Sequence, residues 1–416
     1  MARRKKHGRR RARPPAPPQP PAAPANGAGR GARRWLLVAG LAICVLLAAL
    51  VGYLITHPGQ PDRSPPAPAA PPQLVQSAPL PTATYVGGET CGQCHAGEAT
   101  AWRTSHHALA MQHASAETML GDFNDATVTH GGVTSRFFRQ GGKFMVHTDG
   151  PDGALHDYAI DFTFGVAPLQ QYLVAFPDGR LQALPLAWDT RPKAEGGQRW
   201  FHLYPNETIA AGDPLHWTGL QQNWNYMCAE CHSTNLRRNY DAQAKRYATT
   251  WSEINVSCEA CHGPGSQHIA WAKREAGWEK IDAQSKGLAV ILDERHGVTW
   301  TLDPQTGNST RSRPRDTMHE IEACVLCHSR RAQIWDAVTP GAPIGDSHRV
   351  ALLDNGLYFP DGQIHDEVYE YGSFRQSRMF QAGVTCSDCH EPHSLALRAP
   401  GNGVCLQCHA SEKYAA

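Results

Sequence analysis

One short pattern, Cys-x-x-Cys-His, occurs six times in this chain of 416 residues. Two thiols about one helical turn apart match the vinyl groups of haem, and the next residue, His, can supply the proximal nitrogen to the iron. One such motif could arise by chance, but six indicate attachment sites for six haems c. Numbered 1 to 6 in chain order, the motifs consist of Cys91, Cys94 and His95; Cys228, Cys231 and His232; Cys258, Cys261 and His262; Cys324, Cys327 and His328; Cys386, Cys389 and His390; and Cys405, Cys408 and His409.

Two other kinds of site use similar cysteine pairs. A thioredoxin-type redox pair needs one Cys-x-x-Cys and no adjoining His, whereas zinc sites usually join two such pairs and place the His further away. Twelve of the 13 cysteines belong to the six motifs, and the remaining one, Cys44, lies in an apolar stretch as an inert residue. No pair is therefore left for a structural disulfide, and the haems and the core must hold the domain together.

The N-terminal part predicts a membrane anchor. Residues 1–34 hold 11 of the 39 Lys and Arg residues and no acid, which predicts a disordered basic tail in the cytoplasm. Residues 35–56 are uncharged and long enough for one transmembrane helix. A cleaved signal peptide is the alternative, but its apolar region is usually about 7–15 residues long. We expect a single-pass anchor in the cytoplasmic (inner) membrane, a Pro/Ala-rich linker over residues 57–82, and a haem domain over residues 83–416 in the periplasm or outside the cell.

The charge of the chain is unevenly distributed. Without the basic tail, 28 Lys and Arg residues remain against 38 Asp and Glu residues. An acidic haem domain argues against a nucleic-acid partner and favours redox partners with basic surfaces. The oligomeric state cannot be deduced from these features.

The spacing of the motifs predicts the fold of the haem domain. The gaps between successive motifs are 132, 25, 61, 57 and 14 residues, so we expect haems 2 and 3, and haems 5 and 6, to lie together. Short helices and loops packed around haems predict a mainly α and irregular multihaem cytochrome c fold. The first gap differs, because alternating apolar stretches such as 158–162 and 181–186 are separated by turns such as 177–179. These predict antiparallel strands, and hence a β-rich insertion over about residues 120–205 between haems 1 and 2.

Other histidines could supply the sixth iron ligand. Of the 22 histidines, 14 lie in the haem domain outside the motifs, and for each a surface or hydrogen-bonded role is the alternative. His268 and His393 follow motifs 3 and 5 closely, His107 follows motif 1 beside His106, and His216 precedes motif 2. Methionine ligation would raise the potential of a haem, but Met is more often core filler. We therefore expect bis-His, low-spin and low-potential haems.

Five stretches between Tyr85 and His409 carry a resemblance to a known family: residues 85–91, 105–111, 223–232, 258–265 and 383–393. They resemble the tetrahaem cytochrome of ammonia oxidisers, a multihaem c-type cytochrome in the superfamily of pentahaem nitrite reductase and octahaem hydroxylamine oxidoreductase. The resemblance implies stacked haem pairs that form an electron wire. It also implies six distal ligands, with His319 as a rival to the second: His107, His202, His216, His268, His348 and His393.

These features favour an electron carrier over an enzyme. The nitrite reductases use a Cys-x-x-Cys-Lys motif at the catalytic haem, which this sequence lacks, and we assign no catalytic residue. The leading hypothesis is electron transfer from a quinol-side donor or a soluble cytochrome to periplasmic or outer-membrane cytochromes. The alternative is a reductase or oxidase of small nitrogen or sulfur compounds, which needs a haem with an open sixth position. A structural or sensory module that stacks its haems with copies of itself is a third hypothesis.

Overall fold

The computed structural model describes residues 82–336, 338–351 and 353–414. The predicted basic tail, the predicted transmembrane helix over residues 35–56 and nearly all of the predicted linker lie outside these residues. Within the part of the chain that is described, no helix is both long enough and apolar enough to cross a membrane.

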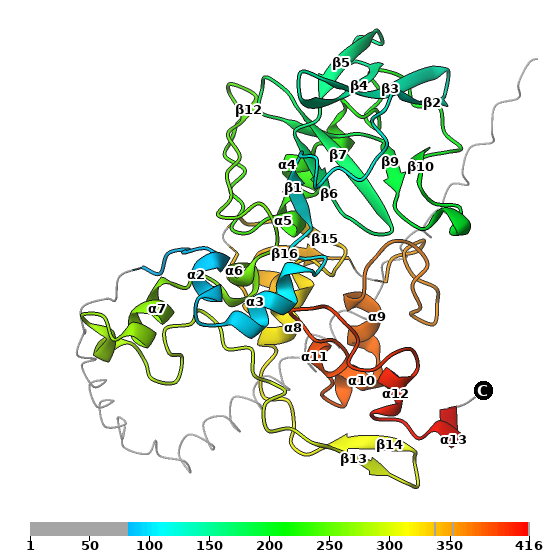
Figure 1. The fold of residues 1–416 in the computed structure, drawn as a ribbon. Coiled ribbons are helices and arrows are strands. Elements are labelled where there is room, and N and C mark those ends of the chain that lie inside the picture. The colour runs from blue at the N-terminus through cyan, green and yellow to red at the C-terminus, as the bar shows by residue number, and fades with distance from the viewer. Residues whose placement is uncertain (1–81, 337, 352, 415–416) are drawn as a thin grey trace, which may run out of the picture. The chain divides into compact units, whose positions relative to one another are not determined.

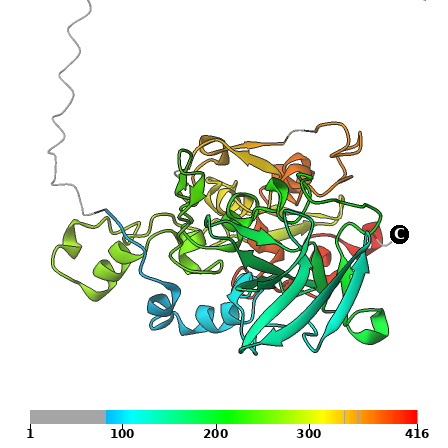
Figure 2. The ribbon, with the colours of Figure 1, turned by 90° about the horizontal axis from the view of Figure 1, so that it is seen from above.

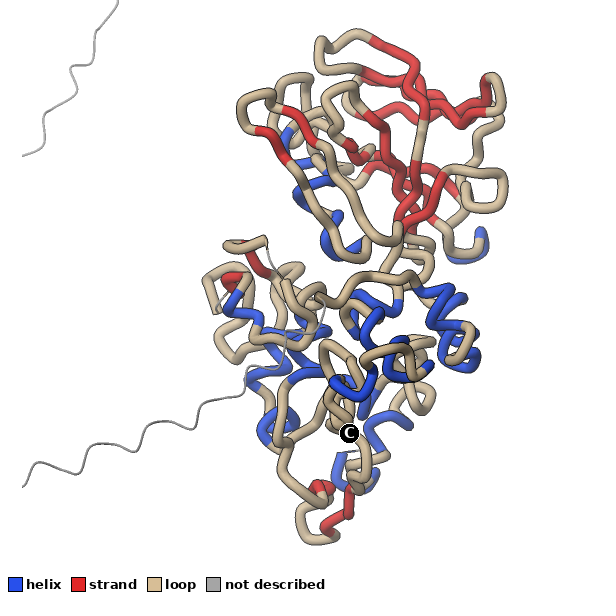
Figure 3. The backbone as a smooth tube through the Cα atoms, turned by 90° about the vertical axis from the view of Figure 1, so that its left-hand side faces the viewer, coloured by secondary structure: helices blue, strands red, loops and turns tan. Residues whose placement is uncertain are grey.

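The prediction of a mainly α fold is wrong, because helices take up 22% and strands 24% of the structure. The helices are short, and the longest of those described, α3 (Ala96–Arg103) and α7 (Ser266–Lys273), have eight residues each. A Cys-x-x-Cys-His motif needs only one helical turn, whereas the long segment between motifs 1 and 2 forms sheet. Figure 3 shows most of the strands gathered in one region and most of the helices in another.

Two antiparallel sheets form the strand-rich region (Figure 1). The first is a meander of β2 (Ala126–His130), β3 (Val133–Gln140), β4 (Lys143–Asp149) and β5 (Leu155–Ala159). The second runs in the order β1-β6-β7-β9-β10, with β8 paired to β7, and its strands are β1 (Met111–His113), β6 (Phe162–Phe164), β7 (Leu169–Ala175), β8 (Leu181–Ala183), β9 (Leu186–Asp189) and β10 (Arg199–His202). Two-residue glycine turns with positive φ join β2 to β3 and β3 to β4, as tight hairpins require.

Strand β7 belongs to two apolar cores. Its side chains alternate between the two faces of the sheet, as the period of a strand dictates. Tyr172 and Val174 pack into a core with aromatic residues of the four-stranded sheet. Leu173 points the other way, into a core with Trp224 and Ala229 of the motif 2 segment. The insertion is therefore packed directly against a haem motif.

The helices carry or flank the motifs. They are α2 (Gly88–Gly92), α3, α4 (Trp224–Met227), α5 (Ala229–His232), α6 (Cys258–His262), α7, α8 (His319–Val325), α9 (Tyr371–Gln376), α10 (Arg378–Gln381), α11 (Cys386–Cys389), α12 (Gly403–Leu406) and α13 (Ser411–Tyr414). Two-stranded hairpins connect them, formed by β11 (Tyr240–Asp241) and β12 (Arg246–Tyr247), β13 (Trp300–Asp303) and β14 (Asn308–Arg311), and β15 (Arg331–Gln333) and β16 (His348–Val350). Figures 1 and 2 both show α7 set apart from the strands of the insertion.

Candidate haem-attachment sites

Each motif is organised by a single helical turn. The peptide N–H of His95 donates a hydrogen bond to the carbonyl of Cys91 at 3.0 Å, and the equivalent bonds in motifs 4, 5 and 6 measure 3.0, 3.0 and 2.9 Å. Motif 3 occupies the whole of α6, which ends at Gly263 with φ of 72°. A Cβ at Gly263 would also lie 2.7 Å from the Cβ of Ala289, so glycine is required there on two counts.

Contacts between thiols join motifs that are distant in the sequence. The thiol of Cys91 in motif 1 interacts with that of Cys258 in motif 3. Motif 4 has two such contacts, through Cys327 to motif 2 and through Cys324 to motif 5. The thiol of Cys324 also lies near Cys261 of motif 3. Motif 4 thus has thiol contacts with more of the other motifs than any other motif has.

A buried carboxylate inside motif 3 connects it to motif 1. Glu259 is 1% exposed, and its carboxylate accepts hydrogen bonds from the peptide N–H groups of Val86, Gly87 and Gly265, at 2.8–3.0 Å. Val86 and Gly87 lead into α2, which carries the first cysteine of motif 1. A buried carboxylate needs such donors to satisfy its oxygen atoms. Glu259 therefore fixes the backbone just before motif 1 and just after motif 3.

Two further acids connect motif 4 to motif 5 and motif 2 to motif 4. Glu320, in the helix that leads into motif 4, accepts hydrogen bonds from the peptide N–H and hydroxyl of Ser387 in motif 5, at 2.6 and 2.8 Å. Glu230, inside motif 2, pairs with Arg331 at 3.1 Å, three residues after motif 4. Sequence reasoning missed Glu230, Glu259 and Glu320. An acid inside Cys-x-x-Cys, where the neighbouring thiols become buried, is the signal that could have revealed two of them.

Two pairs of histidine rings have the separation expected for ligands on opposite sides of one iron. The ring centroids of His95 and His268 lie 6.2 Å apart, as do those of His107 and His328. Two rings at this separation could hold one haem iron between them. The structure thus brings two of the predicted distal histidines, His107 and His268, opposite the histidines of motifs 4 and 1.

Hydrogen bonds and burial prepare these rings for ligation. Nδ1 of His268 bonds to the carbonyl of Lys286 at 2.9 Å, and Nδ1 of His232 to the carbonyl of Ala110 at 2.9 Å. A carbonyl can only accept, so Nδ1 carries the proton and Nε2 keeps its lone pair for a metal. Burial lowers the pKa of His107 to about 4, with the nearby His328 adding to the effect. A neutral ring is the form that binds iron.

His393 lies among the histidines of motifs 1 and 3. The pKa of His262 is lowered first by burial and then by the proximity of His393, His95 and His268. Nδ1 of His393 lies 3.0 Å from a carboxylate oxygen of Glu391. Burial opposes ionisation of this carboxylate, but hydrogen bonds from Ser394 and His393 outweigh it and lower the pKa of Glu391 to about 2. A carboxylate behind an imidazole fixes the orientation of the ring.

The other three predicted distal ligands have different surroundings in the structure. Nδ1 of His348 bonds to Ser347 at 2.8 Å and Nε2 to Glu230 at 3.1 Å. His202 stacks on His130, with centroids 3.7 Å apart, and its Nδ1 accepts a hydrogen bond from the peptide N–H of Tyr204. Sequence reasoning did not single out His130, and no motif surrounds it in the sequence.

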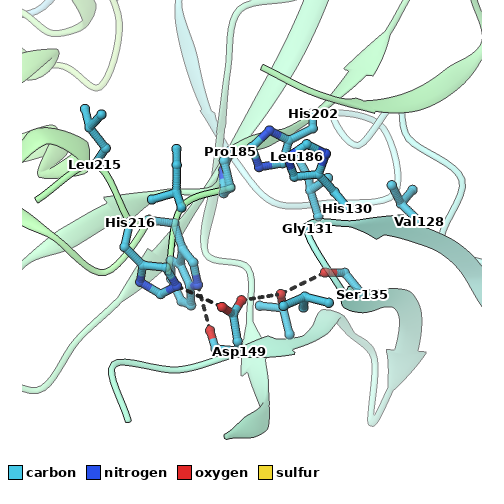
Figure 4. A pocket seen from close by; sticks show the side chains of 14 residues that line it. Val128, His130, Gly131, Ser135, Asp149, Pro185, Leu186, His202, Leu215 and His216 are labelled. Atoms are coloured by element: carbon cyan, nitrogen blue, oxygen red, sulfur yellow. Dashed lines mark hydrogen bonds and ion pairs between the residues drawn. The ribbon is translucent and has the colours of Figure 1, made fainter. Parts of the chain in front are cut away.

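His216 belongs to a pocket in the insertion that also contains His130 and His202 (Figure 4). It is 4% exposed, and its Nδ1 bonds to the hydroxyl of Thr218 at 2.8 Å and its Nε2 to Asp149 at 2.9 Å. Both ring nitrogens are therefore used by the protein. In this arrangement His216 joins the end of β4 to the segment before motif 2, and it is not directed at a motif.

Replacing Asp149 with alanine is expected to destabilise the insertion. Burial opposes the charge of Asp149, but hydrogen bonds from His216 and Thr148 prevail and lower its pKa. The substitution leaves a buried ring nitrogen of His216 unsatisfied, which costs about 1–3 kcal/mol of the free energy of unfolding. Because the folded pKa is the lower one, the carboxylate stabilises the fold above its unfolded pKa of about 3.9, and this contribution is lost as the pH falls through the folded value.

Urea unfolding followed by tryptophan fluorescence tests this prediction at neutral pH and in acid. Asp157→Ala is the control, since its pair with His147 is 33% and 48% exposed and contributes less than about 1 kcal/mol. Equal losses in the two variants, or a loss for Asp149→Ala that does not decrease as the pH is lowered, would contradict the assignment.

The side chains around the motifs fit a haem. Burial raises the pKa of Cys228 to about 12 and that of Cys261 to about 11, so these thiols lie in the apolar surroundings that a haem edge needs. Buried donor atoms near the motifs have no hydrogen-bond partner among the described residues, namely Trp224 Nε1, Ser257 Oγ and Arg311 Nε. Such donors suit the carboxylates of haem propionates.

Comparisons with known proteins give matches of two kinds. A family model described as cytochrome c554 and c-prime matches residues 90–131 and 202–263, and a model for a doubled CXXCH motif matches residues 379–414. The crystal structure of the outer cell wall cytochrome OcwA is similar at 17% identity, with 79% of this chain and 68% of that chain covered and a TM-score of 0.45. An undecaheme cytochrome from the S-layer of Carboxydothermus ferrireducens is similar at 18% identity, with 81% and 44% covered and a TM-score of 0.37. A search of curated proteins found no match.

The family models support a broad assignment. They match segments that contain motifs 1, 2, 3, 5 and 6. They do not support the narrower resemblance to the tetrahaem cytochrome of ammonia oxidisers. The repeated one-turn motifs, the histidines placed opposite two of them and the matching family models together make this chain a multihaem c-type cytochrome that binds haem c through its Cys-x-x-Cys-His motifs.

Proposed function

We propose that the chain carries six haems c and relays electrons between redox partner proteins. The observation that carries the proposal is the series of contacts between motifs. Thiol contacts connect motif 1 to 3 and motif 4 to 2 and 5, with Cys261 of motif 3 near Cys324 of motif 4. Cys389 of motif 5 likewise lies near Cys405 of motif 6. Redox groups attached to neighbouring motifs would be close enough to exchange electrons along the whole set.

When bound, each haem supplies a one-electron Fe(III)/Fe(II) couple. The chain holds these groups at fixed positions and sets their surroundings. Glu259, Glu320 and Glu230 fix the motif pairs, as described above. Burial keeps His107 neutral, and a backbone carbonyl orients the ring of His268. Bis-His ligation on such rigid supports limits the rearrangement that accompanies a change of iron charge and suits electron transfer better than substrate binding.

The compartment and the partners form part of the proposal. The haem domain would work in the periplasm or outside the cell, where c-type cytochromes with many haems meet other redox proteins. Its donor would be a quinol-side protein or a soluble cytochrome, and its acceptor a periplasmic or outer-membrane cytochrome. The acidic balance of the chain beyond residue 34 supports partners with basic docking faces.

Haem content and spin state test this function. Intact mass of the purified protein is expected to show six covalent haems, and electron paramagnetic resonance of the oxidised protein is expected to show low-spin signals. We propose that every iron has two protein ligands, and cyanide and CO should then leave the optical spectrum unchanged. Fewer than six haems would show that a motif is unused. One high-spin haem that binds these ligands would instead favour the alternative, a reductase or oxidase of small nitrogen or sulfur compounds.

A further inference from the structure

An exposed acidic loop, residues 353–370, lies between β16 and α9, and Figure 1 shows it in orange where the chain enters α9. It contains no Lys or Arg. One base outside the loop, Arg330, approaches Asp366 at 3.6 Å. The loop therefore presents a strongly negative surface. Its acids, all exposed, are Asp354, Asp361, Asp366, Glu367 and Glu370.

Large apolar side chains are exposed among these acids. Leu353, Phe359, Ile364 and Tyr369 are 55%, 48%, 41% and 47% exposed. Apolar and aromatic side chains surrounded by charge are typical of a protein interaction surface. Their exposure is not a sign of poor packing, because Tyr358 of the same loop is buried at 8% and the loop has its own backbone hydrogen bonds.

Backbone bonds hold the acidic loop against motif 4. The peptide N–H of Tyr371 donates to the carbonyl of His328 at 3.2 Å, and that of Arg330 donates to the carbonyl of Val368 at 3.2 Å. Tyr369 also lies near Cys228 and Cys231 of motif 2. The surface is therefore only one layer of residues away from motifs 2 and 4. Motif 4 is also the motif with the most thiol contacts to other motifs.

We propose that the acidic loop is the docking surface for a redox protein with a basic face, which exchanges electrons through motifs 2 and 4. This inference rests on the proposed electron-transfer function and adds the place of entry or exit. Opposite charge attracts and orients such a partner, and the apolar side chains form the centre of a small, transient contact. A second copy of the chain is a poor occupant, since its haem domain is itself acidic.

The experiment measures electron transfer from the fully reduced, full-length protein to an oxidised monohaem cytochrome c with a lysine-rich face. Stopped-flow rates are compared at about 10 mM and about 150 mM salt, where the screening length falls from about 30 to about 8 Å. The test variant combines Asp354→Asn, Asp361→Asn and Glu367→Gln. The control variant removes the same charge from exposed positions in and just after the insertion by Glu195→Gln, Glu207→Gln and Asp213→Asn.

The second-order rate constant of the test variant is expected to fall about tenfold at low salt and by much less at high salt, with the control within about twofold of the wild type. Equal losses in the two variants, or no loss in either, overturn the proposal. A dimer that dissociates only in the test variant assigns the surface to a second copy and also overturns it. A further variant replaces the 11 basic residues of positions 1–34 by Gln. If this variant reacts faster only when the acidic loop is intact, the loop binds that basic segment, and the proposal is overturned.

A parallel reaction with a small inorganic oxidant separates this inference from the function on which it rests. All variants should be oxidised completely and at equal rates by the inorganic oxidant. If the wild type is not fully oxidised, the relay itself fails. If it is, and the loop variant still reduces the cytochrome normally, only the docking surface fails.

Discussion

Replacing His107 with alanine is expected to open one iron to external ligands. The His107 ring lies opposite His328 of motif 4, with centroids 6.2 Å apart, and burial keeps it neutral. Without it, a haem held by motif 4 would lack its proposed sixth protein ligand and would become high-spin. CO and cyanide binding should rise from none to about one per chain, and the potential of that haem should rise, because an axial nitrogen no longer stabilises the ferric state.

His106→Ala is the matched control. His106 is adjacent in the sequence but exposed, so its loss should change neither the ligand binding nor the spin state. Spectroscopic titration of both variants with CO and cyanide decides the matter. If His106→Ala opens an iron and His107→Ala does not, the ligand has been assigned to the wrong member of the pair. If neither does, motif 4 has another distal ligand.

The second large effect is expected from removing both thiols of motif 4, Cys324 and Cys327, by serine substitution. These thiols contact motifs 5 and 2, and α8 packs Ile321 and Val325 into a third apolar core. Loss of this haem removes a large apolar group from the place where three motifs meet. We expect the yield of folded holoprotein to fall at least tenfold, as buried large-to-small changes of several kcal/mol would produce.

Serine at Cys405 and Cys408 in motif 6 is the comparison. Both variants lose two thiols, but motif 6 has neighbours only in motif 5 among the thiol interactions noted above, and Cys405 is exposed. This variant should accumulate with a mass lower by one haem and with its remaining optical spectrum unchanged. Intact mass and yield, measured side by side, test the contrast. Equal yields would show that motif 4 is not central to the fold.

The sequence was sufficient for the chemistry of the sites and insufficient for their arrangement. Cys-x-x-Cys-His is a local pattern, so each attachment site can be recognised without the fold. The distal positions depend on long-range packing, and proximity in the sequence indicated His268 and His107 but also His216. His216 also lies close to a motif in the sequence, yet in the structure its two ring nitrogens bond to Asp149 and Thr218. Only the tertiary structure shows which of these rings lie near a motif histidine.

The fold class was predicted wrongly for a related reason. One-turn motifs suggested helices, but a motif constrains only about five residues and leaves its surroundings undetermined. The strands were visible as apolar stretches between turns, for example at 172–174, where Tyr172 and Leu173 face different cores. What the pattern could not reveal was that motif 2 would pack on the second face of this sheet.

The hydrogen bonds of Glu259 have a kinetic consequence. They join residues 172 and 173 positions apart, from Gly87 and Val86 to the middle of motif 3. Closing so long a segment carries an entropic cost, and we expect it to follow the formation of local turns. Motifs 1 and 3 would therefore remain accessible on an incompletely folded chain. This delay provides an interval in which haem can be joined to the cysteines before the carboxylate closes the two motifs against each other.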